Sequence, residues 1–408
     1  MARASGYPKQ ALQDVQQASF VSFLNLSRWT AASVVFLGHL RDPLFQGYAN
    51  VAGRDRNPFV QVWYFVTGLS YEAVIVFFVL SGYLVGGLGV ARLSAKTFSL
   101  QSYAIDRITR LYVALLPALL LTALLDSVGQ SVFGDVGFWQ ATQPLMAEKF
   151  PGASFVATLT VRDFIQNVCM LQTVRTLPFG SNLPLWTISL EFWFYVVFGV
   201  AMATYLATSW RIRGIGAVVV CIALALLGWR FPLYMGMWFF GVIAAATPWR
   251  WIERPVLASA FFCVSLIAAR ILHPKIHHDS ALGWGADYLV ALGFAWLLIS
   301  FRSRKSVLLQ KMSSLNRLMA DFSYSLYLVH FPLMLFLLAI VQTLPIFAEI
   351  AMGYSPDNPS GLFAYAIVAT LVYLGAWIFS LGTERKTAKV RNWLRKLLSK
   401  PDALHERV

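Results

Sequence analysis

The sequence predicts an all-α fold, a polytopic membrane helix bundle of about ten transmembrane helices with both termini cytoplasmic. One observation is composition: 58% of the 408 residues are hydrophobic and 13% are charged, whereas soluble domains average about 45–50% and about 25%. The other is that the apolar residues gather in runs of about 20, the length that crosses a hydrocarbon core about 30 Å thick. Three cysteines without metal-binding spacing predict neither a zinc site nor a disulfide framework.

The apolar runs give the predicted spans in order. They cover residues 18–40, 72–91, 109–127, 184–206, 214–230, 232–247, 256–272, 285–301, 321–343 and 362–382. The fifth and sixth runs are separated only around Arg230, Phe231 and Pro232, so one hairpin buried in protein is the alternative for this pair. The outer loop 128–184 contains residues 155–173, which are too polar to span and predict an amphipathic helix on the outer face.

The distribution of basic residues predicts the orientation. If the N-terminus is cytoplasmic, the inner segments hold 24 of the 33 Lys and Arg and the outer segments hold 9. Because basic loops stay inside during insertion, we expect an even number of spans, and the net charge of +14 needs no nucleic-acid partner. We expect a membrane domain over 1–383 and a basic cytoplasmic tail over 384–408. The tail is either an amphipathic helix on anionic headgroups of the lipid bilayer or only the last positive-inside anchor.

The first span carries two ionisable residues, Arg28 and His39. Ionisable groups inside spans are costly and by default mark functional sites. Eleven residues separate the two, which is within about 20° of a whole number of helical turns and about 16 Å along the axis. The pattern predicts an arginine and an imidazole on one helix face. The alternatives are a snorkelling anchor for Arg28 and a carbonyl-bonded interfacial histidine for His39.

Further polar residues lie in or beside other spans. Arg107 and Arg110 have the i, i+3 spacing that places two guanidiniums on one side of a helix, suited to a polyphosphate; the alternative is a positive-inside role. Glu191 is the one carboxylate well inside a strongly apolar span, and it is either the partner of an intramembrane cation or a proton-handling group. Ser81 and Gly82 predict either close helix packing or the close approach of a ligand chain.

Five of these elements, taken in order, resemble the signature of the acyltransferase-3 family. They are Arg28 with His39, FFVLSGYL at 77–84, RITR at 107–110, LPLWTISLEFWFY at 183–195 and FSYSLYLVHFPL at 322–333. Members are bacterial integral-membrane O-acyltransferases that modify surface glycans, lipopolysaccharide, Nod factors and antibiotics. Two departures are Val113, where many members have proline, and the lack of the C-terminal hydrolase-like domain that some members carry. We therefore expect the chain to act alone or with a separate polysaccharide-assembly partner.

The resemblance implies an acyl-CoA donor, usually acetyl-CoA, that reaches the site from the cytoplasm, and an acceptor hydroxyl met from the outer side. The acceptor would be an extracytoplasmic or lipid-linked glycan, and the location the bacterial inner membrane. The resemblance also implies that His39 is catalytic and that Arg28, Arg107 and Arg110 are functionally important.

The residues themselves suggest how such a reaction would run. The inner arginines would hold the coenzyme A phosphates, and the thin pantetheine arm would run past Ser81 and Gly82 toward His39. His39 would act as general base on the acceptor hydroxyl or as a transient acyl carrier. Glu191 would fix the tautomer of His39 or orient a neighbouring arginine, while His330 is expected to bond across helices. This chemistry requires no metal.

Two other classes of protein remain as alternatives. A transporter or flippase for a lipid-linked sugar or small molecule would show repeated halves and broken helices, and no repeat stands out in the sequence. A glycosyltransferase would usually have a carboxylate cluster in an outer loop, whereas the outer carboxylates here are scattered.

Overall fold

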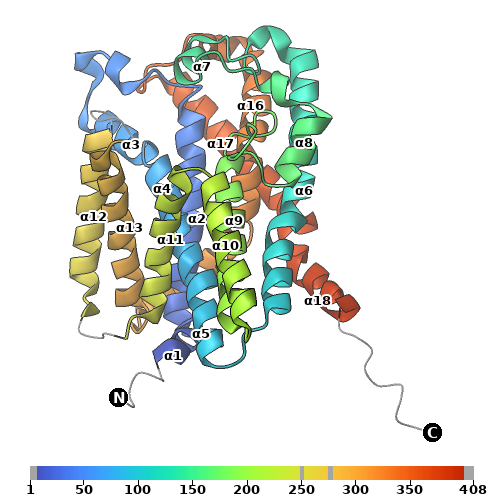
Figure 1. Cartoon of the computed structure of the whole chain (residues 1–408). Coiled ribbons are helices and arrows are strands. Elements are labelled where there is room, and N and C mark those ends of the chain that lie inside the picture. The colour runs from blue at the N-terminus through green and yellow to red at the C-terminus, as the bar shows by residue number, and fades with distance from the viewer. Residues whose placement is uncertain (1–6, 249–251, 274–278, 399–408) are drawn as a thin grey trace.

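The structure, a computed structural model, describes residues 7–248, 252–273 and 279–398. Within these ranges the chain forms helices and no strand; one isolated bridge joins Phe45 and Tyr354. Figure 1 shows long helices side by side, with the short α1 (Tyr7–Asp14) and α18 (Thr387–Leu398) at one end. We call this the tail end and the opposite end the loop end. The all-α membrane bundle is confirmed, while the cytoplasmic location of the termini stays a prediction.

Eight long apolar segments of the described chain can each cross a membrane. They are α2 (Ala18–Arg41), α4 (Ser70–Ser81) continued through a π-helical turn (Gly82–Gly87) into α5 (Leu88–Ser94), α6 (Leu100–Phe133), α9 (Leu185–Leu206), α12 (Pro255–Leu272), α13 (Ala281–Phe301), α16 (Ser323–Gln342) and α17 (Pro359–Gly382). The middle of the bundle is α16, which packs on α2, α6 and α17. Side chains from several elements can therefore meet around it.

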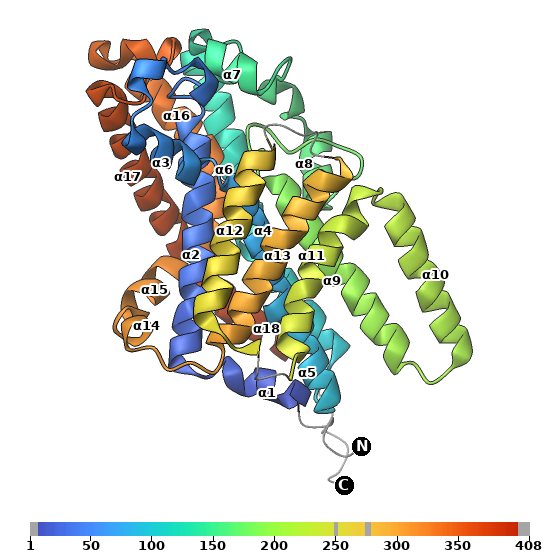
Figure 2. The ribbon, with the colours of Figure 1, turned by 90° about the vertical axis from the view of Figure 1, so that its left-hand side faces the viewer.

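Of the about ten predicted spans, the fifth and sixth form one bent pair. Helices α10 (Trp210–Leu226) and α11 (Arg230–Ala246) have 17 residues each and meet at an angle of 116°. Each is about 26 Å long, shorter than the hydrocarbon core. Gly228 permits the reversal because it adopts a left-handed φ of 81°. The described chain thus has eight candidate spans, or nine if this bent pair counts as one span. In Figure 2, α10 stands away from the bundle.

Helix α6 is longer than the run 109–127 predicted for it. It has 34 residues, about 51 Å, so it extends beyond the hydrocarbon core. It begins early because the Ser99 side chain accepts a hydrogen bond from the backbone N–H of Ser102, an N-cap. Its last turns carry polar residues that are stable in a helix outside the membrane. The long loop therefore begins near residue 134, later than predicted.

The amphipathic helix predicted over 155–173 is shorter in the structure. A 3₁₀ turn (Phe155–Thr158) precedes α8 (Val161–Val168), whose N-terminus is capped by the Thr160 side chain. Val161 and Ile165 are exposed on one side of α8. The helix stops at Val168 because Met170 has a positive φ of 58°, which helices do not accommodate.

Shorter helices close the two ends of the bundle. They are α3 (Pro58–Thr67), α7 (Pro144–Lys149), α14 (Val307–Lys311), α15 (Ser313–Ala320) and the 3₁₀ segments Tyr48–Asn50, Gly53–Asp55, Gly134–Val136, Pro345–Ala351 and Glu384–Lys386. The loop that follows α8 is fixed to the bundle by Asn182, whose amide donates to the carbonyl of Leu328 and to the Thr122 hydroxyl. These two bonds join the loop to α16 and α6. Asn182 lies just before the start of α9 (Leu185–Leu206).

Candidate active site

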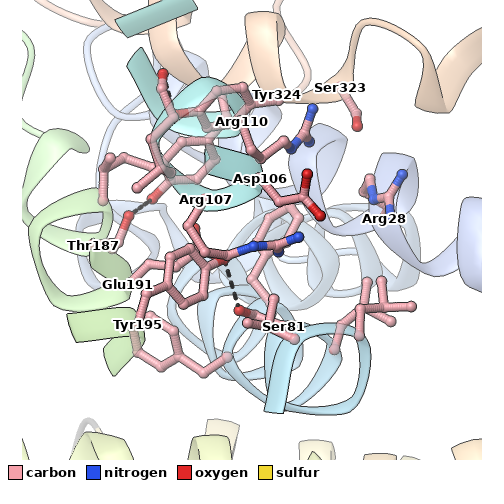
Figure 3. Close-up of a pocket in the computed structure, with 18 of the residues that line it drawn as sticks. Arg28, Ser81, Asp106, Arg107, Arg110, Thr187, Glu191, Tyr195, Ser323 and Tyr324 are labelled. Carbon is pink, nitrogen blue, oxygen red and sulfur yellow. Dashed lines mark hydrogen bonds between the residues drawn. The ribbon is translucent and has the colours of Figure 1, made fainter. Parts of the chain in front are cut away.

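Five of the seven predicted site residues line one cavity near the tail end of the bundle (Figure 3). The cavity encloses about 250 Å³ between α2, α4, α6, α9, α16 and α18. The predicted residues in its lining are Arg28, Ser81, Arg107, Arg110 and Glu191. The apolar part of its wall comes mainly from α4, with Phe77, Phe78 and Leu80, and from the π-helical turn that follows it, with Leu84. Residues from four separate predicted spans thus meet in one place.

The three predicted arginines differ in their partners. Arg110 Nη1 lies 2.9 Å from Glu384 Oε1, and its guanidinium lies 4.6 Å from the centre of the Tyr324 ring. Arg107 lies over the rings of Tyr103 and Tyr195, and its buried Nε has no hydrogen-bond partner.

Within the described residues neither Arg28 nor Arg107 forms an ion pair with a carboxylate. An unpaired guanidinium inside a bundle is costly. The cavity therefore has unused capacity to bind an anion.

A chain of hydrogen bonds ends on Glu191. The indole N–H of Trp238 donates to Ser81 Oγ at 3.2 Å, and Ser81 lies 3.1 Å from the Tyr195 hydroxyl, which donates a short bond to Glu191 Oε1. Because Trp238 can only donate, the donors run in one direction, from the indole to the carboxylate. Glu191 is thus held as an acceptor at the cavity wall, and it does not contact His39. The partner predicted for the His39 tautomer is a different residue.

Gly82 does not line the cavity, contrary to the prediction that a ligand arm passes it. A Cβ on Gly82 would lie 1.8 Å from the Trp238 carbonyl oxygen, and one on Gly241 would lie 1.9 Å from the Val79 carbonyl oxygen. The two glycines let α4 and α11 approach until their backbones touch. Of the two interpretations of this small-residue stretch, helix packing holds for Gly82, whereas Ser81 does face the cavity.

His39 lies further along α2, in contact with His330 of α16. His39 Nδ1 is 2.9 Å from His330 Nε2, and the two rings stack with their centres 5.2 Å apart. His330 is fully buried, and its Nδ1 lies 3.1 Å and 2.8 Å from the carbonyl oxygens of Leu326 and Tyr327. The expected cross-helix bond of His330 is confirmed, and its partner is the predicted catalytic residue. We call His39 and His330 the histidine pair.

The hydrogen-bond partners assign the tautomers of the histidine pair. Carbonyl oxygens only accept, so His330 Nδ1 carries its proton and, in the neutral ring, His330 Nε2 accepts. His39 Nδ1–H must then donate to it, which leaves the lone pair on His39 Nε2. A fixed ring with a lone pair on the far nitrogen is the arrangement that a general base needs.

One layer of side chains separates the histidine pair from the cavity. Tyr327 lines the cavity, its hydroxyl bonds Thr187 Oγ1 at 2.7 Å, and its ring packs edge-on to Phe77 with centres 5.6 Å apart. The ring of Tyr327 also lies 5.8 Å from that of His330. Arg28 lines the cavity and His39 contacts His330 of α16, and Tyr327 lies between the cavity and the histidine pair.

Charged residues surround the loop-end side of His39. Asp42 follows α2 and pairs with Arg41 at 2.6 Å and with Lys149 at 3.0 Å. Burial favours the neutral carboxyl, but the charges of Lys149 and Arg41 outweigh it and hold the pKa of Asp42 below its usual value. An ionised carboxylate therefore lies one turn beyond His39. In the described ranges no group of three or more His, Cys, Asp and Glu is placed to hold a metal ion.

Comparison with known proteins assigns the general chemistry. The model of the acyltransferase-3 family, described as an acyltransferase domain, matches residues 21–381, from the first turn of α2 to the end of α17. The chain belongs to the acyltransferase-3 family. The match spans every predicted site residue, so the resemblance of the motifs is confirmed, and the protein is a multi-pass membrane acyltransferase.

One relative is named for its activity. An O-acetyl transferase of Shigella phage Sf6 is 27% identical over 280 residues, which cover 64% of this chain and 72% of the relative. No solved structure matches this acyltransferase. An acyltransferase needs an acyl donor and an acceptor substrate.

The sequence did not identify the residues that hold His39 or those that close the cavity. His330 lies in the last of the resembling motifs, and its place inside the apolar run 321–343 was the available signal. Tyr327 lies three residues earlier on the same helix. Glu384 lies beyond the last predicted span and gave no signal, because a single acidic residue in a basic tail is ordinary.

Proposed function

We propose that this acyltransferase is an O-acyltransferase that moves an acyl group from cytoplasmic acyl-CoA to a hydroxyl of an extracytoplasmic or lipid-linked glycan. The acyl group we propose is acetyl, the group in the name of the phage relative. The observation that carries the proposal is the pairing of His39 with His330, which leaves a lone pair on His39 Nε2 one residue layer away from a cavity with unpaired guanidiniums.

The donor would bind in the cavity. Coenzyme A has an anionic phosphate head, and the guanidiniums of Arg28, Arg107 and Arg110 can form charge-assisted bonds to phosphate oxygens. The apolar wall of Phe77, Phe78 and its neighbours suits the uncharged pantetheine arm. The tail end would face the cytoplasm, where acyl-CoA is found, because the basic residues concentrate in the segments predicted to lie inside.

The thioester would reach the histidine pair by passing Tyr327. About 16 Å separate Arg28 from His39 along α2, and Tyr327, in contact with Thr187 and Phe77, lies between the cavity and His330. Rotation of the Tyr327 side chain, with loss of its bond to Thr187, would open the way. Donor binding and opening would then be coupled, which would protect the thioester from water until the acceptor is present.

The transfer itself would use His39 as general base. His39 Nε2 takes the proton of the acceptor hydroxyl while the oxygen attacks the thioester carbonyl carbon. The carbon–sulfur bond then breaks, and the leaving thiolate takes the proton back from His39, so that the products are an O-acyl ester and free coenzyme A. His330 accepts a hydrogen bond from His39 Nδ1–H throughout and holds the ring in this orientation.

Glu191 would act through its charge on the arginines. Its carboxylate lies in the same cavity and is bonded to Tyr195. A fixed negative charge there would orient the guanidiniums of Arg107 and Arg110 and limit their mutual repulsion. We therefore propose a positioning role for Glu191 in donor binding.

The test uses the purified full chain in detergent with acetyl-CoA labelled in the acetyl group. The intact protein should bind the donor and release labelled acetate or transfer it to added membrane glycolipid, and His39→Ala should bind the donor without either reaction. Comparison of O-acetyl content in the surface glycan of bacteria with and without the gene would identify the acceptor. An intact protein that neither binds nor cleaves acetyl-CoA would contradict the proposal.

A further inference from the structure

The segment 384–398 follows the last span and lies outside the part of the chain that the family model matches, which ends at residue 381. It comprises the 3₁₀ turn Glu384–Lys386 and α18, and it packs against α6 (Figure 1). The sequence predicts for this segment either an amphipathic helix on lipid headgroups or the last positive-inside anchor. In the structure it forms part of the cavity wall, since Thr387 and Arg391 line the cavity.

Glu384 anchors the start of this segment. Its Oε1 lies 2.9 Å from Arg110 Nη1, and its Oε2 accepts from the Ser325 backbone N–H at 2.9 Å and from the Ser325 hydroxyl at 3.1 Å. The Glu384 side chain is 7% exposed. The turn is therefore fixed to both α6 and α16, and α18 starts at a defined position beside the cavity.

Two arginines one turn apart on α18 lie against Asp106 of α6. Arg395 Nη2 is 2.7 Å from Asp106 Oδ1, and Arg391 Nε is 3.8 Å from the same oxygen. The Arg391 Nε is buried and makes no hydrogen bond. Asp106 is thus hydrogen-bonded to Arg395, while Arg391 lies at the cavity with its hydrogen-bonding capacity unused.

The carboxylates in and beside the cavity already have partners. Asp106 accepts from Arg395, Glu191 accepts from Tyr195, and Glu384 accepts from Arg110 and Ser325. No carboxylate of the described chain is hydrogen-bonded to Arg28, Arg107 or Arg391. Three guanidiniums that face one cavity with free donors can each form charge-assisted bonds to a separate phosphate oxygen, as a ligand with several phosphate groups requires.

We propose that Arg391 is a further donor-binding residue, which holds a phosphate group of the acyl donor at the tail-end mouth of the cavity. Asp106, Arg395 and Glu384 position it by fixing α18 to α6. The proposal rests on the function proposed above, that the donor is acyl-CoA. It extends the donor site into a segment that lies beyond the family match.

Helix α18 provides a matched control. Thr387, Arg391 and Arg395 are spaced four residues apart and face α6, whereas Lys389 lies two residues from Arg391, on the opposite side of the helix. Lys389 is exposed. Lys389→Ala therefore removes the same charge from the same helix without altering the cavity, and it tests whether general electrostatic attraction explains any loss.

The experiment measures coenzyme A binding to the full chain by titration calorimetry in nanodiscs of phosphatidylcholine at one fixed, low salt concentration. Arg391→Ala should weaken binding about tenfold or more, since hydrogen bonds to charged groups are among the strong ones. The affinity of Arg391→Lys for coenzyme A should lie between those of Arg391→Ala and the unaltered protein. The affinity of Lys389→Ala should stay within about twofold of that of the unaltered protein. Melting temperatures identify any variant that fails to fold, and Arg391→Lys then carries the test.

Equal affinity of Arg391→Ala and the unaltered protein, or equal losses in Arg391→Ala and Lys389→Ala, would overturn the assignment of Arg391. A lipid headgroup carries the same phosphate chemistry, so the titration is repeated with phosphatidylglycerol in the discs. Competition of that lipid with coenzyme A, lost in Arg391→Ala, would assign the phosphate site to lipid and overturn the donor role. No binding of coenzyme A by the unaltered protein would overturn the proposed donor itself, together with this assignment.

Discussion

Two regions along α2, around Arg28 and around His39, have opposite surroundings. Around Arg28 the bundle is hollow and charged, with a cavity of about 250 Å³ and guanidiniums that have no carboxylate partner in the described chain. Around His39 the bundle is closely packed, and the ring is hydrogen-bonded to a fully buried histidine that is itself bonded to two carbonyls. One rigid helix holds these two environments about 16 Å apart.

The difference shows which physical requirement each region meets. A site for a charged ligand needs space and unpaired opposite charge, which are costly until the ligand binds. A general base needs a fixed orientation and a defined tautomer, which close packing and complete hydrogen bonding provide. If the cavity binds the donor and His39 takes the proton, as we propose, the arrangement separates donor binding from proton transfer, and variants of the two regions should fail in different ways.

His39→Ala should have the largest effect. Loss of the general base should lower the rate of acyl transfer about 10²- to 10⁴-fold, measured as release of free coenzyme A in the presence of acceptor. His39→Gln is the matched control, because it keeps a polar side chain of similar size that can still bond His330 but cannot take a proton. Transfer at the unaltered rate by either variant would refute the assignment of the base.

Arg107→Ala should have the next largest effect, on donor binding. Because a buried charge-assisted bond to phosphate is lost, the Kd for coenzyme A should rise about 10- to 100-fold. The rate at saturating donor should change little, since the histidine pair is untouched. Arg107→Lys keeps the charge without the planar guanidinium, so its Kd for coenzyme A should lie between those of Arg107→Ala and the unaltered protein. A large fall in the saturated rate with an unaltered Kd would show that the two regions are not separate.

His330→Ala should lower the saturated rate by about tenfold, less than the loss of His39 itself. His39 would keep Nε2, the nitrogen that takes the proton. It would lose the hydrogen bond to His330 that fixes its tautomer and orientation. The Kd for coenzyme A should stay unchanged, and the pH dependence of the rate should shift, which a purely structural defect would not produce. An unaltered rate and pH profile would remove His330 from the account.

A third polar cluster, at the loop end, should affect stability alone and has the smallest expected effect. His273 follows α12; its Nδ1 is 3.3 Å from Glu72 and its Nε2 is 3.0 Å from Asp287. Hydrogen bonds to Asp287 and then Glu72 raise the pKa of His273 to about 9, against the opposing effect of burial.

Because this pKa is raised on folding, the stabilisation is complete below the unfolded value of about 6.5 and is lost as the pH rises through about 9. The melting temperature of the protein in detergent should therefore fall by a few degrees over this interval, and less in His273→Asn. A pH profile of melting that is the same in both proteins would contradict the role of His273. Donor affinity at a fixed pH should be the same in both.

Much of the fold follows from the sequence because membrane helices are long and uniformly apolar. All ten apolar runs are helices. The sequence left open whether α10 and α11 are two spans or one hairpin, because both are apolar, and only the bend of 116° between them shows that they form a broken pair. The true ends of α6 were missed because a helix can continue past the membrane on polar residues.

The cavity could be predicted better than the contacts within it. Arginine and glutamate inside apolar runs have few places to lie, so Arg28, Arg107, Arg110 and Glu191 meet. The bond between His39 and His330 joins residues 291 positions apart, and the sequence contains no local signal for such a pair. Gly82 was misassigned, since a glycine that packs helices and one that admits a ligand look alike in sequence.

The separation of donor binding from proton transfer is tested most directly by titrating coenzyme A into His39→Ala. The two regions share α2 but are divided by Tyr327. The variant should bind coenzyme A within about twofold of the Kd of the unaltered protein while it transfers no acetyl group. A loss of coenzyme A binding in this folded variant would mean that the histidine belongs to the donor site, and the division into two regions would be wrong.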